Sequence, residues 1–333
     1  MEINNCQSFR HLIRMMGSVT FLAALFCLLA ATSGMCMGPH PDKKQANELT
    51  IFRKAGLTKD RSLASALIIA LKNPPERFYT FVALHALAQM GATEALPAIN
   101  ALLATSHDTG LVNYAITAKA RLLAESGAQA IKDPKVRAQV KLAMLYQQTG
   151  LTPNALNAAA KEYQVFVGTP GTPVPIGVCL MREAADVLYQ EGVASSAVEA
   201  APPDYSLDPA SALKVRMAPL SPKERINALI EQLANMKTYM PSEPYAIQLL
   251  ADMGLAAEQA VDAKLVDMDL HQEQYDGLGF RALFDVLRGI GDASQTSLVQ
   301  DFARDPTREA ADAAAGALAD VSAGRKLVLA MGY

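Results

Sequence analysis

Residues 83–104 read "ALHALAQMGATEALPAINALLA", and this stretch decides the fold class. On both sides of Met90-Gly91-Ala92, Ala and Leu recur at the spacing that gives a helix one apolar face. Helices commonly end in the left-handed conformation, which glycine adopts without steric cost. The stretch therefore predicts two antiparallel helices joined by a short turn at Gly91.

The same arrangement recurs along the chain. Gly127 follows Gly91 by 36 residues and Gly291 follows Gly254 by 37, and an Ala- and Leu-rich run precedes each glycine. Self-similarity at a period of roughly 20 to 50 residues is typical of helical solenoids, in which each helix pair stacks on the next. We therefore expect residues 83–104 to be one unit of an array.

The composition supports a fold made only of helices. The 333 residues are 51% hydrophobic but only 6% aromatic, with no Trp, and Ala and Leu are the strongest helix formers. The β-branched and aromatic residues that favour sheets are sparse. We predict an all-α protein, an α-α superhelix of helical hairpins in two arrays joined by a Pro-rich bridge.

The repeated pattern A-x-x-A-L-x-x-hydrophobic-G-[AD]-x-x-A resembles HEAT-type repeats, particularly the short form also found in bilin lyases. Its best copies are Ala83–Leu103 and Ala282–Ala319, and Gln248–Leu265 is a looser copy with two residues inserted in the turn. The resemblance implies an armadillo-like superhelix that presents a binding surface.

A second stretch follows a different pattern. In "LAMLYQQTGLTPNALNAAAKEY", residues 142–163, four residues fall at tetratricopeptide-like spacing: Ala143, Tyr146, Gly150 and Ala155. The aromatic residue and the proline that usually follow in that family are missing. Both repeat types stack helix pairs into superhelices, so the expected architecture is the same.

Proline and glycine mark the boundaries between the expected parts. "VGTPGTPVPIG" (167–177) and "APPDYSLDPASALKVRMAPLSP" (201–222) are rich in residues that interrupt helices. Ser221, Pro222 and Glu224 then form the sequence of a capping box with Pro at the first helical position. The predicted parts are a signal peptide at 1–37, an N-terminal helical array at 48–166, a bridge with one helix at 167–220 and a C-terminal HEAT-like array at 221–333.

The N-terminus predicts export. Arg10, His11 and Arg14 precede the apolar run "SVTFLAALFCLLAATSG", which is followed by small residues, as in a secretory signal peptide. We expect cleavage between Ala31 and Gly38 and a periplasmic or secreted protein. The alternative is an uncleaved anchor in the inner membrane, because no Asp, Glu, Lys or Arg occurs between Arg14 and Asp42.

Charge is distributed unevenly along the chain. The net charge of −3 argues against nucleic acid as a partner. Residues 42–163 contain 15 Lys and Arg against 9 Asp and Glu, whereas residues 242–333 contain 7 against 15, so the balances are +6 and −8. The two halves could attract each other within one molecule or between molecules, or could simply be solvated surfaces.

The sequence contains no motif that predicts catalysis. It has no H-E-x-x-H, C-x-x-C, Walker phosphate loop or G-x-S-x-G, and we expect no catalytic residue, cofactor or metal. We expect His85 to be a hydrogen-bonded core residue and His107 to lie in a turn that caps the next helix. After loss of the leader only Cys36 and Cys179 remain, which allows at most one disulfide.

The segment "DMDLHQEQYD" could gather metal ligands only as an extended loop. Its candidate residues are Asp267, Asp269, His271 and Glu273, which lie two apart and would diverge on a helix. A charged loop between hairpins is the simpler interpretation.

The region 236–280 is the expected contact surface. Tyr is favoured at interfaces, and Met offers an adaptable apolar surface, although Met at helical spacing also fills cores. The candidate interaction residues are Met236, Tyr239, Met240, Tyr245, His271 and Tyr275. We expect an exported, non-catalytic scaffold of the cell envelope that binds another protein and can self-associate. The alternatives are a bilin-lyase-like enzyme and a cofactor- or lipid-binding solenoid.

Overall fold

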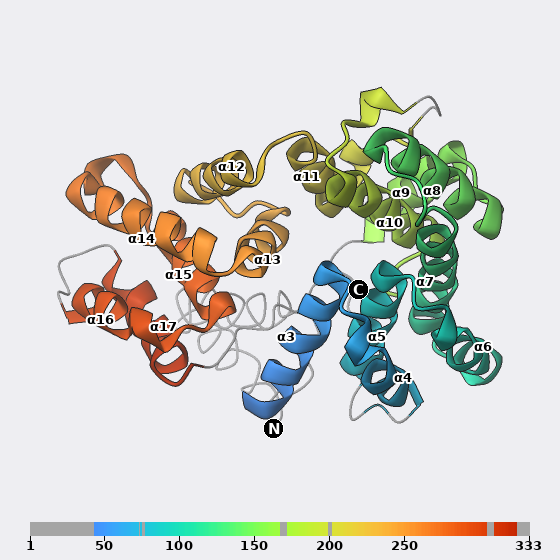
Figure 1. Cartoon of the computed structure of the whole chain (residues 1–333). Helices are drawn as coiled ribbons and strands as arrows, with labels where there is room; N and C mark the ends of the chain where they lie inside the picture. The colour runs from blue at the N-terminus through green and yellow to red at the C-terminus, as the bar shows by residue number, and fades with distance from the viewer. Residues whose placement is uncertain are drawn as a thin grey trace, which may run out of the picture. The chain divides into compact units, whose positions relative to one another are not determined.

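The computed structural model describes residues 43–72, 74, 77–166, 172–198, 202–304 and 310–324 (Figure 1). In these residues the chain forms fifteen α-helices, six short 3-10 helices and no strand, so the predicted all-α fold class is confirmed. The colours of Figure 1 follow the helices from α3 in blue to α17 in red. The predicted signal peptide, residues 1–37, lies outside the described residues.

Most of the helices follow one another with short connections, and the stretch between α10 and α11 is longer. The first group is α3 (Lys43–Thr58), α4 (Ala64–Lys72), α5 (Arg77–Met90), α6 (Leu96–Thr105), α7 (Thr109–Gly127), α8 (Pro134–Thr149), α9 (Pro153–Phe166) and α10 (Ile176–Glu191). The second group is α11 (Pro209–Met217), α12 (Pro222–Ala234), α13 (Glu243–Met253), α14 (Leu255–Leu270), α15 (Gly277–Ile290), α16 (Thr296–Arg304) and α17 (Ala311–Ser322). Short 3-10 helices, η1 to η6, occupy Arg61–Leu63, Thr93–Ala95, Ser195–Ala197, Tyr205–Leu207, Gln272–Gln274 and Ala293–Gln295.

Three hairpins, α3–α4, α5–α6 and α15–α16, share one kind of turn. In each, the residue after the first helix has a positive φ, namely 56° at Lys59, 63° at Gly91 and 67° at Gly291. One further residue and a 3-10 helix of three residues then lead into the second helix. The pattern around glycine predicted the second and third of these turns. The first was missed because lysine stands where the others have glycine.

The looser repeat copy differs from its prediction at the turn. Gly254 alone separates α13 from α14, where two additional residues were expected. Gly254 has φ 61° and ψ −136°, a conformation outside the left-handed helical region of the other turns. The sequence likeness at Gln248–Leu265 therefore does not extend to the shape of the turn.

Buried apolar side chains form two large clusters. One draws on residues 64–218, mainly from α4 to α10, and the other on residues 213–321 from α11 to α17. Small residues let the helices approach closely in both. A Cβ atom at Gly279 would lie 2.4 Å from the Ala234 carbonyl oxygen, so α15 can reach the end of α12 only with glycine at this position.

The predicted bridge, residues 167–220, contains two helices where one was expected. Helix α10 packs against α7 and α8, and Val178, Leu180 and Leu188 in α10 are completely buried. Helix α11 contributes Leu213 and Met217 to the second cluster. Although prolines interrupt this stretch, its helices belong to the two cores.

The start of α12 has the predicted cap. The Ser221 hydroxyl accepts a hydrogen bond from the Glu224 backbone N–H, and the Glu224 carboxylate accepts one from the Ser221 N–H at 2.9 Å. This capping box satisfies backbone donors that the first helical turn leaves free.

No helix in the described part of the chain has both the length and the apolar content of a membrane span.

Candidate functional site

The six candidate interaction residues do not form one surface. Met236 is only 2% exposed and belongs to the second apolar cluster, so its prediction as a surface residue is corrected. Met240 is half-buried against the same cluster. Methionine follows the apolar pattern of a core as readily as that of a binding surface, and here packing decides.

Two of the tyrosines are held in separate polar contacts. The Tyr245 hydroxyl accepts a hydrogen bond from Arg182 of α10 at 3.4 Å, which ties α13 to the first group of helices. The Tyr275 hydroxyl contacts the Lys264 ammonium at 3.0 Å. His271, at the end of α14, is exposed, and its Nδ1 lies 3.0 Å from the Asp267 carbonyl oxygen.

Tyr239, like His271, lies on an open surface. Its side chain is in the connection between α12 and α13 and is 61% exposed. The Arg281 guanidinium donates a hydrogen bond to the Tyr239 hydroxyl at 2.5 Å and lies 5.6 Å from the centre of its ring. Both contacts fix the orientation of the arginine on α15.

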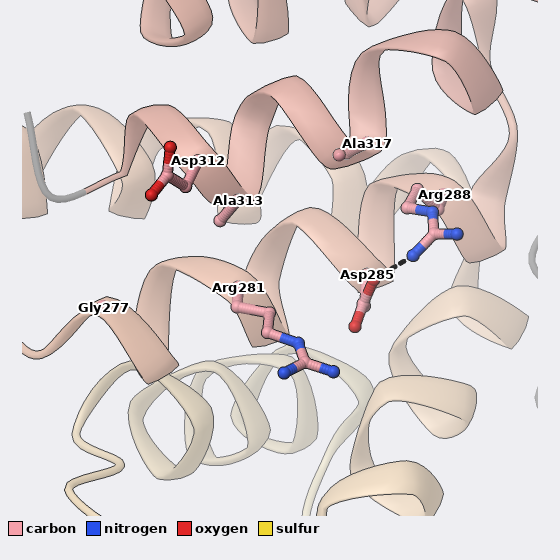
Figure 2. A pocket seen from close by; sticks show the side chains of 8 residues that line it. Gly277, Arg281, Asp285, Arg288, Asp312, Ala313 and Ala317 are labelled. Carbon is pink, nitrogen blue, oxygen red and sulfur yellow. Dashed lines mark hydrogen bonds and ion pairs between the residues drawn. The ribbon is translucent and has the colours of Figure 1, made fainter. Parts of the chain in front are cut away.

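Arg281, which contacts Tyr239, also lines a pocket of about 370 Å³ between α15 and α17. The pocket is lined by Arg281, Asp285 and Arg288 of α15 and by Asp312, Ala313 and Ala317 of α17, and Figure 2 shows the Arg281 and Asp285 side chains pointing away from α17. The small side chains of α17 leave room beside the arginines. The volume lies at the lower end of the roughly 300 to 1,000 Å³ that ligand pockets span.

The two arginines of this pocket are held differently. Arg288 is neutralised by carboxylates, because its Nη1 lies 2.6 Å from Asp285 and its Nη2 lies 2.7 Å from Asp320. Arg281 donates to the Tyr239 phenol, and its charge also acts on buried Glu243 of α13, where it opposes the rise in pKa that burial causes. A guanidinium in this setting keeps donors for an incoming carboxylate or carbonyl oxygen.

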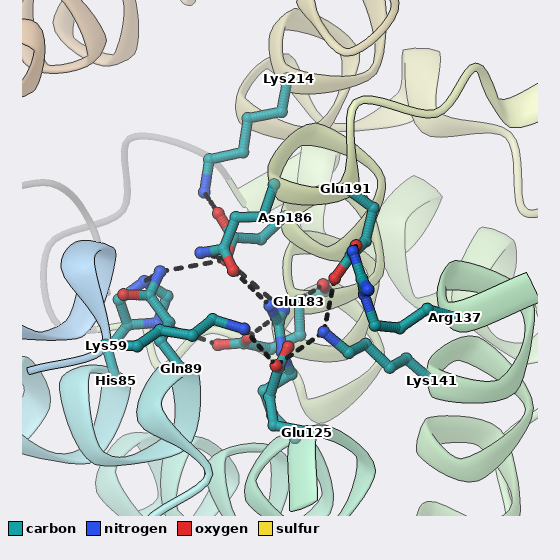
Figure 3. A network of polar contacts seen from close by, with 12 residues as sticks. Lys59, His85, Gln89, Glu125, Arg137, Lys141, Glu183, Asp186, Glu191 and Lys214 are labelled. Atoms are coloured by element: carbon teal, nitrogen blue, oxygen red, sulfur yellow. Dashed lines mark hydrogen bonds and ion pairs between the residues drawn. The ribbon is translucent and has the colours of Figure 1, made fainter. Parts of the chain in front are cut away.

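A second polar site is buried among the first group of helices. Arg121 of α7 is completely buried. Figure 3 shows the polar network to which it belongs, with Glu125 of α7 lying close to Glu183 of α10. The Arg121 Nε lies 2.9 Å from Glu125, and its Nη1 lies 3.3 Å from Glu183 and 3.4 Å from Asp186. A further donor reaches the Gln190 side chain at 3.0 Å.

Other cations extend this network to neighbouring elements. Lys141 of α8 contacts Glu125 and Glu191 at 2.6 Å each, and Lys59 of the α3–α4 turn contacts Glu125 at 2.7 Å. Lys214 of α11 contacts Asp186 at 2.8 Å. The network therefore joins α7, α8, α10 and α11 to the turn after α3.

Burial and charge act in opposite directions on the acids of the network. Burial alone would raise the pKa of Glu125, but Arg121 and Lys141 hold this pKa below its ordinary value. Burial likewise opposes ionisation of Asp186, and Lys214 and Arg121 bring the pKa of Asp186 well below its ordinary value. Both carboxylates are thus ionised at neutral pH.

The histidines and the acidic segment occupy ordinary positions. His85 is half-buried, and its ring nitrogens lie 3.1 Å from Glu183 and 2.9 Å from Gln89, which confirms the hydrogen-bonded role expected from the sequence. The cap of α7 is Asp108, next to His107. In the segment predicted as a charged loop, Asp267 and Asp269 lie in α14, because its periodicity continues through them.

Cys179 lies in the core and is free, and Cys36 lies outside the described residues. Burial raises the pKa of the Cys179 thiol to about 12, so this group stays protonated and unreactive at neutral pH. No group of three or more metal-binding side chains gathers within the described ranges.

No family model, no curated protein and no solved structure matches this chain.

Sequence reasoning missed the two arginines that organise these sites. Arg281 and Arg121 each lie in a helix with a largely apolar sequence. At such a position an arginine is ordinarily expected to face solvent. The available signal for Arg121 was its place among Ala118, Leu122 and Glu125 on α7, where an arginine facing inward needs a buried acid. For Arg281, the signal was its proximity to the predicted tyrosine region.

Proposed function

We propose that this protein is an exported, non-catalytic scaffold whose helical hairpins present a binding surface for another protein in the cell envelope. The observation that carries the proposal is the pairing of exposed Tyr239 with Arg281, a residue that lines the α15–α17 pocket. Tyr and Arg are enriched among the residues that dominate protein–protein binding energy.

The pocket indicates what the partner presents. Arg281 has donors for an acidic side chain, and the small residues of α17 leave space for an apolar or aromatic side chain beside it. A protein segment with a carboxylate next to a bulky side chain would use both. The HEAT-like resemblance agrees with such a role, since stacked helix pairs form extended binding surfaces.

Export is the second part of the proposal, and it rests on the sequence of residues 10–38. N-terminal sequencing of the protein from its native host tests it. We expect the mature chain to begin between Ala31 and Gly38, and a chain that begins at Met1 and sediments with membranes would favour the anchor.

Affinity capture from envelope fractions tests the binding surface. The tagged native chain is compared with the double variant Tyr239→Ala and Arg281→Ala, and with Arg304→Ala, an exposed arginine on α16 that is paired with Asp301 at 3.5 Å. We expect a polypeptide that is retained by the native chain and by Arg304→Ala and is lost from the double variant. Equal retention by all three would reject this surface.

Absorbance of the purified native protein addresses the alternative. A scaffold has only the ultraviolet absorbance of its tyrosines, whereas a visible band would indicate a bound chromophore and favour cofactor handling.

A further inference from the structure

Two acidic side chains, Glu258 and Asp262, lie one helical turn apart on α14 and form the α14 acid pair. Their spacing of four residues places them on the same face of the helix. Glu258 is only 4% exposed, and Asp262 is half-buried. One oxygen of each group, Glu258 Oε2 and Asp262 Oδ1, is buried and has no hydrogen-bond partner. A buried carboxylate oxygen without a donor is costly, so both oxygens require a further positive or donating group.

The Gln295 side chain contacts both acids. It lies in η6, between α15 and α16, and its Nε2 donates a hydrogen bond to Glu258 Oε1 at 2.5 Å. Burial and the charge of Glu258 raise the pKa of Asp262 to about 6, although a hydrogen bond from Gln295 acts in the opposite direction. One neutral amide therefore serves two acids, and no Lys, Arg or His in the described part of the chain forms an ion pair with either.

The buried acids of the first group of helices are in a different situation. There Asp186 meets Lys214 at 2.8 Å, and Glu125 meets Lys141 at 2.6 Å. In that network the protein itself supplies the positive charge. Around the α14 acid pair it supplies oxygen atoms and one amide, which is the donor set that a hard cation requires.

We propose that Glu258, Asp262 and Gln295 bind a hard divalent cation of the Mg²⁺ and Mn²⁺ type. These ions are held by one or two carboxylates and keep several water ligands. A half-turn of the Gln295 amide exchanges its nitrogen for its oxygen, which gives a third protein ligand. The site thus holds only two of the Asp, Glu, His and Cys side chains that usually gather at a metal, and the amide completes it.

The cation joins two elements of the second group of helices. Two ligands come from α14 and the third comes from the turn between α15 and α16, so the ion fastens α14 to this hairpin. Half-buried Asp262 leaves one side of the site open to water and to the entering ion. The inference is independent of the proposed binding surface, because neither Tyr239 nor Arg281 is a ligand.

Binding of Mn²⁺ to the untagged full chain tests the proposal. The protein is freed of metal with EDTA and titrated with MnCl₂ at about pH 8, and the free ion is followed by electron paramagnetic resonance. We expect one Mn²⁺ per chain, displaced by excess Mg²⁺. Asp262→Asn should weaken the affinity at least about tenfold, since loss of outer-shell support alone costs this much. The matched control on α14 is Asp267→Asn, at a side chain that is 47% exposed and pairs with Lys264, and it should leave the affinity unchanged.

Two results of the titration would overturn the proposal. One is the absence of bound Mn²⁺ at millimolar concentration, which would leave the two acids to share a proton instead. The other is an equal affinity of the native chain and Asp262→Asn, which would place the ion elsewhere.

Thermal unfolding at about pH 8 provides a second measurement on the same proteins. In EDTA, Asp262→Asn should melt above the native chain, because it removes the repulsion within the α14 acid pair. Millimolar MgCl₂ should raise the melting temperature of the native chain and of Asp267→Asn by about 2 to 4 °C and leave that of Asp262→Asn unchanged. A gain of the same size in all three proteins would contradict a site at these residues.

Discussion

Arg121 has the most buried charge of the ion network, and its carboxylate partners depend on it. Breaking a buried ion pair on one side typically costs about 3 to 5 kcal/mol, because the remaining charge stays buried without a partner. We therefore expect Arg121→Met to lower the free energy of unfolding by about 3 to 5 kcal/mol in urea titrations. Arg304→Met, which removes an exposed ion pair, should change it by less than about 1 kcal/mol. Equal losses in the two variants would contradict the role of the network.

Asp262 should make the protein more stable in mild acid. Burial, with Glu258 nearby, raises the pKa of Asp262 to about 6 in the folded chain, from an ordinary value of 3.8. The folded chain then binds a proton that the unfolded chain releases between about pH 4 and 6, so stability is highest below this window and falls as pH rises through it.

Replacing this carboxyl tests the pH dependence. Because Asp262 is partly exposed, we expect Asp262→Asn to raise stability at pH 7 to 8 by about 1 kcal/mol and to leave it unchanged near pH 4. Thermal unfolding followed by circular dichroism from pH 4 to 8 measures both. A gain of the same size at every pH would show that desolvation of the charge is not the cause.

At the scale of elements, replacing glycine by alanine should change the stability of the fold in opposite directions in a hairpin turn and inside a helix. Gly291 has φ 67°, so Gly291→Ala should destabilise the fold by about 1 to 2 kcal/mol. Gly316 lies inside α17 with no atom within 4 Å of an added Cβ, and Gly316→Ala should stabilise by about 0.5 to 1 kcal/mol. Urea titration of both variants is the measurement, and two changes of the same sign would contradict this account of the turn.

Elements defined by local chemistry could be predicted from the sequence, and contacts between distant residues could not. Ser221, Pro222 and Glu224 predicted the start of α12 because a capping box is local chemistry. The turn at Lys59 was not predicted because its left-handed residue is not glycine. The contact of Lys59 with Glu125 joins residues far apart in the sequence, so it depends on how α7 packs in the folded chain. Tyr239 was predicted as a contact residue, but its partner Arg281 was not, because Arg281 lies 42 residues along the chain and meets Tyr239 only in the folded protein.

At the scale of the whole molecule, the uneven charge gives a salt-dependent prediction. Arg53 and Asp252 join the basic range 42–163 to the acidic range 242–333 at 2.6 Å. Attraction between more distant exposed charges is screened beyond about 8 Å at physiological salt. We expect small-angle scattering at rising salt to show either a larger radius of gyration at constant mass or a loss of self-association. No change in either quantity would leave the asymmetry without a role inside this protein.

The central claim is that a partner protein binds where Tyr239 meets Arg281. Photo-cross-linking in the native host tests it most directly, with benzoylphenylalanine in place of Tyr239 and, as the control, in place of Ile69, which is 62% exposed on α4 and outside the pocket lining. The account predicts one discrete adduct with another protein at position 239 that is absent at position 69 and is lost when Arg281→Ala is added. No adduct at 239, or the same adducts at both positions, would contradict it.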